Sequence, residues 1–214
     1  MLIKYPRTPH FAFSPGTSND DRVLESLDGF EGKQVVITEK MDGENTTLYD
    51  NCWHARSLDS KSHPSRTWLQ GFHSCIQHKI PVGWRICGEN LYAKHSIPYI
   101  NLESYFLGFS IWNEYNIALS WEETIYFFRE MGIVPVPVLY TGTFDLKLIL
   151  SMVCDMDITK MEGIVVRITD RINYSDFNKY VAKWVRPGHV ESDGHWMYSK
   201  IHKNILKQGS TKCG

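Results

Sequence analysis

Apolar and polar positions alternate along this chain in short runs, a pattern that is more typical of strands than of helices. The runs are rich in β-branched and aromatic residues and are bounded by turn residues such as Gly, Pro, Asn and Asp. The pattern predicts two or three strands within 33–58, a short strand after a turn at 113–116, and single strands at 84–91, 105–112, 134–140, 163–168 and 180–185.

Turn residues and prolines refine this strand prediction. Asp42-Gly43 suits the turn of a hairpin, and Asp50-Asn51 is expected to form a second turn. Pro135 and Pro137 each remove a backbone donor, so the strand at 134–140 is expected at the edge of a sheet.

Helical spacing of apolar residues is confined to a few segments. The clearest is 121–131, where Ser120 and Glu123 have the spacing of a capping box and Gly132 follows the last turn. Other helices are predicted at 65–80 and 144–154, with at most a short helix in each of 21–27 and 197–208. Strands therefore outnumber helices and do not alternate with them, which predicts an α+β fold with mainly antiparallel sheets.

The chain length and composition indicate one globular domain spanning 1–214. A chain of 214 residues buries roughly 70% of its unfolded surface. The hydrophobic fraction of 43%, with seven tryptophans, argues for a packed core and against disorder. Residues 1–32 are expected to form an irregular N-terminal arm, and 187–214 a short C-terminal tail.

Charge and cysteine content limit the possible partners and compartments. The formal net charge is -1, so any nucleic acid must be held by a local basic patch. The five cysteines are an odd number without a Cys-x-x-Cys pair, which argues against a disulfide framework or a structural zinc site. With neither a membrane span nor a signal-peptide core in the sequence, we expect a cytoplasmic protein with no membrane partner.

The segment 38–45, Thr-Glu-Lys-Met-Asp-Gly-Glu-Asn, is the strongest candidate for chemistry. Lys40 follows an apolar run and falls near the end of a predicted strand, where its side chain is held more firmly than on a loop. Enclosure by polar and cationic neighbours would favour loss of its proton and make it a nucleophile. A surface lysine beside a turn is the alternative interpretation.

Further charged and aromatic side chains occur at other strand ends. Arg56 closes the 33–58 meander and is expected to return toward Lys40, and Glu89 interrupts an apolar strand where it could accept bonds from ribose. Glu162 precedes a strand that is expected to be buried, so it needs a cation or a metal as partner. The strand at 105–112 offers aromatic rings for base stacking, and Lys183 interrupts another apolar strand. Each of these also fits an ion pair, a surface residue or a core residue.

Nucleotide phosphates would have to be bound by side chains in this chain. There is no Gly-x-x-x-x-Gly-Lys-Ser/Thr loop and no Gly-x-Gly-x-x-Gly after a strand.

Taken together and in order, these segments resemble the ATP-dependent RNA ligases of the covalent nucleotidyltransferase superfamily. The resemblance rests on Lys-x-Asp-Gly at 40–43, Arg-Ser at 56–57, Gly-Glu at 88–89, the aromatic strand at 105–112, Glu-Gly at 162–163 and the lysine strand at 179–186. The sequence Gly-Glu-Asn-Leu-Tyr-Ala-Lys-His-Ser-Ile, which begins at Gly88, looks like the RNA ligase form of the Gly-Glu motif. The resemblance covers roughly 1–196 and implies the nucleotidyltransferase fold of a ligase adenylation domain.

The resemblance implies a role for each matching residue. Lys40 would attack the α-phosphorus of ATP and become a lysyl-adenylate, and Lys183 would contact the α-phosphate. Glu162 would position a catalytic Mg²⁺ or Mn²⁺ ion. Arg56 would bind phosphate, Glu89 would bind ribose and Phe109 would stack on adenine. The motifs imply further nucleotide contacts from Glu39, Asp42, Gly43 and Arg186.

The same resemblance implies the later steps and the partner. AMP passes to a 5′-phosphate end of RNA, and a 3′-hydroxyl then displaces AMP and seals the strand. A GTP-using guanylyltransferase of the capping type shares the Lys-x-Asp-Gly chemistry and is the second enzyme interpretation. A nucleotide-binding module without turnover is the third, although the intact set of Lys40, Glu89, Glu162 and Lys183 argues against loss of activity.

The chain also departs from its relatives. Ser110 stands where an acidic residue often follows the stacking aromatic, and Arg186 takes the place of a second lysine after Lys183. The arm and the tail leave no room for the separate OB-fold or helical domain that many relatives carry. We therefore expect the arm, with His10 and Arg22, or the tail, with His189, His195 and Lys200, to help bind pyrophosphate or RNA.

Overall fold

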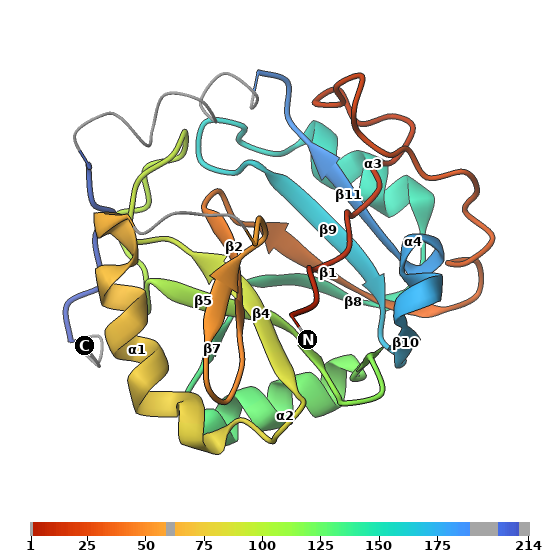
Figure 1. The fold of residues 1–214 in the computed structure, drawn as a ribbon. Coiled ribbons are helices and arrows are strands. Elements are labelled where there is room, and N and C mark those ends of the chain that lie inside the picture. The colour runs from red at the N-terminus through yellow and green to blue at the C-terminus, as the bar shows by residue number, and fades with distance from the viewer. Residues whose placement is uncertain (1, 59–62, 189–200, 210–214) are drawn as a thin grey trace.

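Two β-sheets form the centre of the molecule, with helices on their outer sides (Figure 1). The structure is a computed structural model and describes residues 2–58, 63–188 and 201–209. One sheet has four strands and the other has seven, and almost all neighbouring strands are antiparallel. The predicted α+β fold with mainly antiparallel sheets is confirmed.

The four-stranded sheet holds the central apolar strands of the chain. Its order is β11 (Val181–Val185), β9 (Gly163–Ile168), β1 (Gln34–Lys40) and β8 (Val138–Thr143). Val35, Val36 and Ile37 are fully or almost fully buried, which fits β-branched residues in a strand with neighbours on both edges. The predicted strands at 163–168 and 180–185 are confirmed here.

The seven-stranded sheet packs against helices on its outer side. Its order is β10 (Ile172–Asn173), β6 (Ile117–Ala118), β5 (Phe106–Trp112), β4 (Arg85–Asn90), β2 (Glu44–Leu48) and β3 (Trp53–Ala55), and β7 (Val134–Pro135) pairs with β5 in parallel. The second predicted turn, at Asp50-Asn51, is confirmed because β2 and β3 pair across it. The strands expected at 84–91 and 105–112 are confirmed as well.

The three longer helices lie where the periodicity predicts them. They are α1 (Thr67–Ile76), flanked by the short 3-10 turns η1 (Pro64–Arg66) and η2 (Gln77–Lys79), α2 (Trp121–Met131) and α3 (Leu146–Cys154). α2 begins with the predicted capping box and ends at Gly132, whose φ of 75° is the left-handed conformation that glycine adopts most easily. One more helical turn, η3 (Tyr174–Asp176), leads into α4 (Phe177–Tyr180). None of the described helices is long and apolar enough to cross a bilayer.

The Asp42-Gly43 turn does not form a hairpin, and that part of the prediction is wrong. β1 pairs with β8 and β9, whereas β2 pairs with β3 and β4, so the two strands that flank the turn belong to different sheets. Pairing of β1 with β8 and β9, and of β2 with β4, buries more apolar surface than a hairpin between β1 and β2 would. The long-range pairing is therefore favoured over the local one. The turn therefore carries the chain from one sheet to the other, and Lys40 lies at this crossing.

The segment 134–140 is also divided between the sheets. Val134–Pro135 pairs with β5, and the edge strand of the four-stranded sheet begins only at Val138. Pro135 and Pro137 cannot continue one ladder because neither has a backbone N–H group. An edge strand is confirmed, but it runs from 138 to 143.

The arm is irregular, as expected, but the helix predicted at 21–27 is absent. The backbone N–H of Leu24 donates to the carbonyl of His10 at 2.7 Å, and the N–H of His10 donates to the carbonyl of Arg22. These long-range bonds use the groups that a helix would pair locally. The arm also extends the four-stranded sheet beside β11, because Phe11 N–H donates to Lys183 O and Lys183 N–H donates to Pro9 O.

The C-terminal segment 201–209 is extended, so the described part of the helix predicted at 197–208 is wrong. Lys203 and Leu206 form isolated bridges with Ala93 and Leu102, and the backbone pairs with the loop after β4 instead of with itself. Figure 1 shows this segment alongside that loop, at the edge of the molecule near α1. Residues 197–200, with Lys200, and the tail histidines at 189 and 195 lie outside the described residues.

Candidate active site

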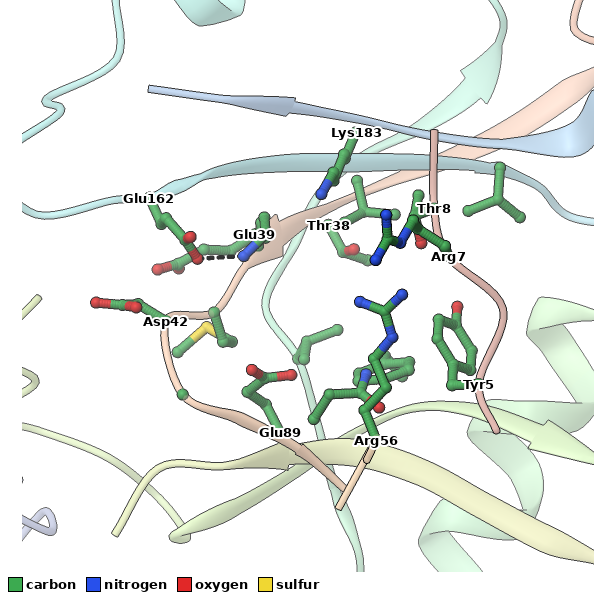
Figure 2. Close-up of a pocket in the computed structure, with 18 of the residues that line it drawn as sticks. Tyr5, Arg7, Thr8, Thr38, Glu39, Asp42, Arg56, Glu89, Glu162 and Lys183 are labelled. Atoms are coloured by element: carbon green, nitrogen blue, oxygen red, sulfur yellow. Dashed lines mark hydrogen bonds and ion pairs between the residues drawn. The ribbon is translucent and has the colours of Figure 1, made fainter. Parts of the chain in front are cut away.

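A pocket with a cavity volume of about 440 Å³ lies between the two sheets, beside the crossing that holds Lys40. This size is in the range of small-molecule sites. Its lining comes from both sheets, the arm and the loop after β4, and it includes every residue of the predicted nucleotide-binding set except Arg186. Figure 2 shows Glu162 and Asp42 at one end of the pocket and Arg7 and Arg56 at the other.

Lys40 is held at the pocket by an ion pair with Glu162. Lys40 pairs in register with Gly163, so Glu162 reaches it from the neighbouring strand end, and the ammonium donates a hydrogen bond to the carboxylate. The two side chains are 23% and 6% exposed. The cation that the buried Glu162 needs is therefore Lys40 itself.

The charge environment of Lys40 differs from the one expected. Burial by itself disfavours the ammonium, but the carboxylates of Glu162, Glu89 and Asp42 outweigh it and raise the pKa of Lys40. Lys183 is a cation of the same pocket that Lys40 repels, but the three carboxylates determine the direction of the shift at Lys40. In the nucleotide-free protein Lys40 is therefore a protonated side chain rather than a ready nucleophile.

Asp42 organises the backbone around Lys40. Its Oδ2 atom accepts hydrogen bonds from Ser96 N–H at 2.7 Å, Ser96 Oγ at 2.7 Å and Ile97 N–H at 2.6 Å, and its own N–H donates to the Tyr99 hydroxyl. The Asp42 side chain is almost fully buried. Asp42 therefore fixes the loop after β4 to the crossing.

Gly43 is required by a close approach rather than by its backbone angle. A Cβ atom at this position would lie 2.6 Å from Asn90 O, 2.7 Å from Leu91 Cδ2 and 3.1 Å from Glu89 Cγ. Any side chain would therefore push β4 away and move the Glu89 carboxylate.

Two carboxyl groups in the pocket have strongly raised pKa values. Burial, together with the nearby charges of Glu162 and Asp42, raises the pKa of Glu89 to about 8, although Lys40 opposes the shift. Burial raises the pKa of Glu39 to about 7. Such shifts concentrate at functional sites, and here they leave Glu89 able to donate as well as accept a hydrogen bond near neutral pH.

The stability of the nucleotide-free protein is expected to fall as pH rises from 4.5 toward 8, because Glu89 keeps its proton in the folded state over this range and loses it in the unfolded state. Replacing Glu89 with Gln removes this titration, so the variant should lose less stability between pH 4.5 and pH 8 than the wild type. Thermal unfolding at several pH values between 5 and 8 checks the difference. Parallel curves for the two proteins would contradict the raised pKa.

Lys183 faces the same pocket from β11, across from Glu89 and Arg56 in Figure 2. Burial and the Lys40 ammonium lower the pKa of Lys183 to about 8. Asp21 of the arm partly compensates, because its Oδ1 atom lies 4.0 Å from Lys183 Nζ. His10 contacts the other oxygen of Asp21 at 3.5 Å and is fully buried, so it supports Asp21 and does not itself line the pocket.

Arg7 is a functional candidate that the sequence analysis missed. It comes from the arm, lines the pocket together with Arg56, and donates to the carbonyl of Asp20 at 2.6 Å. Arg22, which was expected to serve the site, lines a separate cavity between the arm and α4. The sequence signal for Arg7 was weak, since a lone arginine between two prolines has no motif around it.

Phe109 presents the aromatic face of the pocket. Its ring is half-buried and lies edge to face against Tyr5, with 5.0 Å between the ring centroids. Phe106, on the opposite face of β5, is fully buried in a different core cluster. Of the rings in the aromatic strand, Phe109 is the one that lines the pocket.

Arg186 lies just outside the pocket and reaches it through Ser96. Its guanidinium donates to Ser96 Oγ at 3.0 Å, and Ser96 in turn donates to Asp42. A direct role of Arg186 in nucleotide binding stays a prediction.

A family model described as RNA ligase matches residues 33–185. The chain belongs to the RNA ligase family. The matched region contains the crossing at Lys40 together with Glu89, Glu162 and Lys183, so the family resemblance predicted from the motifs is confirmed. Arg7 lies outside the matched region. No curated protein matches this chain in sequence.

Solved structures of ligases share the fold of this RNA ligase domain. An archaeal ATP-dependent RNA ligase matches with a TM-score of 0.58 and 15% identity, over 86% of this chain and 48% of its own. A second form of an archaeal ATP-dependent RNA ligase has a TM-score of 0.59, with 13% identity over 86% of this chain and 48% of its own. Naegleria gruberi RNA ligase with PPi has a TM-score of 0.57 and 16% identity, over 87% of this chain and 61% of its own. The chain thus spans about half the length of the archaeal ligases.

Proposed function

We propose that this chain is the nucleotidyltransferase domain of an ATP-dependent RNA ligase and that Lys40 becomes covalently adenylylated. The observation that carries the proposal is the position of Lys40 at the crossing between the two sheets, in contact with Glu162 and in the same pocket as Lys183 and Arg56. A lysine held at the wall of a nucleotide-sized pocket, which also presents Lys183 and Arg56 for binding phosphate, is suited to attack a phosphoryl group.

In the proposed first step, Lys40 Nζ forms a bond to the α-phosphorus of ATP, and the bond from that phosphorus to the pyrophosphate oxygen breaks. The electron pair leaves with pyrophosphate. The Lys40 ammonium gives up two of its three protons, which pass to water and to the departing pyrophosphate, and the third stays on the phosphoramidate nitrogen. Lys183, Arg56 and Arg7 line the pocket and would stabilise the growing negative charge on the phosphate oxygens. Glu89 would hold the ribose hydroxyls, and Phe109 would stack on adenine.

The carboxylates of the pocket fit a divalent ion that binds together with a nucleotide. No cluster of three or more His, Cys, Asp or Glu side chains suited to a metal occurs among the described residues. Mg²⁺ commonly uses one or two protein carboxylates plus phosphate oxygens, and Glu162 is suited to be such a ligand. Bound there, Mg²⁺ or Mn²⁺ would neutralise phosphate charge. It would also compete with the Lys40 ammonium for Glu162, which favours loss of the proton from Lys40.

The later steps act on RNA. The AMP group would pass from Lys40 to a 5′-phosphate end, and a 3′-hydroxyl would then attack that phosphate and release AMP. Family membership supports RNA as the substrate, and a variant of Naegleria gruberi RNA ligase, similar in fold to this chain, is described with ATP and Mn. The four described cysteines are free thiols, which suits the reducing cytoplasm that we propose as the location.

Intact-mass spectrometry of the purified protein tests the proposal. Incubation with ATP and Mg²⁺ should add one adenylyl group, and GTP should add nothing. Addition of RNA with a 5′-phosphate and a nearby 3′-hydroxyl should remove the group and give a sealed product. A guanylyl adduct would instead indicate the capping-type guanylyltransferase reaction. The lack of any adduct would favour a nucleotide-binding module without turnover.

Phe109→Ala is expected to weaken ATP binding by about 1–3 kcal/mol, because the stacking contribution of one ring is lost. This corresponds to a rise in Kd of roughly 5- to 150-fold. Titration calorimetry in a Lys40→Ala background measures binding without turnover. Phe109→Tyr keeps the ring and serves as the matched control. An unchanged Kd for the alanine variant would show that adenine does not stack on Phe109 and binds at another wall of the pocket.

A further inference from the structure

The loop after β4 and the C-terminal segment together form a basic surface beside the pocket. Lys94 N–H donates to His202 O at 2.7 Å, and Ala93 forms an antiparallel bridge with Lys203. This pairing places Lys94, His202, Lys203 and Lys207 on two adjacent backbone segments, and all four side chains are exposed. We call these four residues the loop–tail surface.

The loop–tail surface is rigidly attached to the core. Asn204 lies between its lysines, is almost fully buried, and donates to Leu91 O at 2.8 Å. Its side-chain oxygen accepts from Tyr99 N–H at 3.0 Å, and its carbonyl accepts from the Tyr105 hydroxyl at 3.0 Å. The segment is therefore an integral part of the fold, which fixes the backbone positions of its lysines.

The surface is continuous with the candidate active site. His95 follows Lys94 and lines the pocket, and Ser96 follows in turn and holds Asp42. On the other side, Tyr99 connects Asn204 to the N–H of Asp42. Lys94 thus lies on the short loop that forms one wall of the pocket, and Lys203 and Lys207 lie on the C-terminal segment that pairs with this loop.

The charge of the surface is positive in its immediate surroundings. Lys203 Nζ lies 4.9 Å from the centroid of the Tyr92 ring, which does not neutralise it. Glu103 is an exposed acid near Lys207, since it follows Leu102, whose carbonyl accepts from Lys207 N–H. Within 91–103 and 201–209, the described parts of the two paired segments, three lysines against one carboxylate leave a positive charge, although the whole chain has a net charge of -1. A protein of this net charge needs such a patch to bind a polyanion.

We propose that Lys94, Lys203 and Lys207 bind the phosphate backbone of the RNA strand whose end occupies the pocket. This inference rests on the proposed function, because it assigns a location to the substrate of that reaction. Flexible exposed lysines contact phosphates without reading sequence, so the surface would position the strand and not select its bases. The C-terminal segment thus supplies RNA contacts close to the reacting phosphate.

The test measures RNA binding and adenylylation separately. Fluorescence anisotropy follows binding of a labelled single-stranded RNA with a 5′-phosphate at several salt concentrations. In the variant Lys94→Gln/Lys203→Gln, two phosphate contacts are lost, so Kd at 0.1 M salt should rise at least about tenfold and the slope of log K against log salt should fall by about 1.4. Adenylylation by ATP, followed by intact mass, should stay at the wild-type level.

The matched control is Lys33→Gln/Lys147→Gln, which removes two exposed lysines at the opposite end of β1 and near the start of α3. It changes the net charge equally and should leave RNA binding close to wild type. Equal losses in both double variants, no loss in the loop–tail variant, or no RNA binding by the wild type would each overturn the proposal. A missing adenylate in the wild type would instead count against the proposed function, independently of the binding result.

Discussion

Lys40→Arg is expected to abolish the covalent adenylate while preserving the stability of the fold. Arginine keeps a positive charge beside Glu162, so the carboxylate, which is only 6% exposed, retains a partner. Its guanidinium stays protonated at every accessible pH and cannot act as the nucleophile. Intact mass after incubation with ATP and Mg²⁺ should therefore show no adduct, whereas thermal unfolding should resemble that of the wild type.

Lys40→Ala separates the two contributions of this lysine. It should also lose the adenylate, but in addition it leaves the Glu162 carboxylate buried without its cation, which costs up to about 3 kcal/mol. For a domain of this size such a loss lowers Tm by roughly 6–12 °C. An adduct on either variant would refute Lys40 as the nucleophile. A Lys40→Ala protein as stable as the wild type would show that the ion pair with Glu162 contributes little.

Asp42→Ala is expected to have the second-largest effect, and mainly through structure. The substitution removes the acceptor of three hydrogen bonds, two from backbone N–H groups of Ser96 and Ile97 and one from Ser96 Oγ. Buried donors left without an acceptor cost about 1–3 kcal/mol each, and partial relaxation of the loop gives an expected total of about 3 kcal/mol. Tm should fall by roughly 6–12 °C, and adenylylation should fall with it because the wall of the pocket moves.

Ser96→Ala is the graded control for Asp42. It removes a single hydrogen bond to the Asp42 carboxylate and keeps both backbone bonds, so about 1 kcal/mol is expected. It also removes the acceptor of Arg186, which tests whether that arginine acts through Ser96. Asp42→Ala with a wild-type Tm and normal adenylylation would show that the loop is held by its other contacts.

Local sequence patterns were sufficient to place most elements of this protein. α2 was predicted with its capping box and terminal glycine because those signals act within one helical turn. The strand around Lys183 was predicted because β-branched and aromatic residues favour an extended, half-buried backbone. The ordered motifs also indicated the RNA ligase family, which the family model confirms.

Charge balance and tertiary pairing could not be read from these patterns. Lys40 was expected among cations, yet its pKa is raised by carboxylates from Glu162, Glu89 and Asp42 that the fold brings together from three separate segments. Arg7 reaches the pocket only because the arm pairs with β11 beside Lys183. Electrostatic energies depend on distance in space, and sequence separation does not report that distance.

The residue types at the candidate site, and the chemistry open to them, follow from the amino-acid sequence alone. Tertiary structure decided that Asp42-Gly43 crosses between sheets instead of closing a hairpin, and that the segment after residue 200 is extended against the loop at 91–102 instead of helical. In both places the competing local structure offers few hydrogen bonds and little burial. Pairing with a distant strand satisfies the same backbone groups and also buries apolar surface, so the long-range arrangement has the lower free energy.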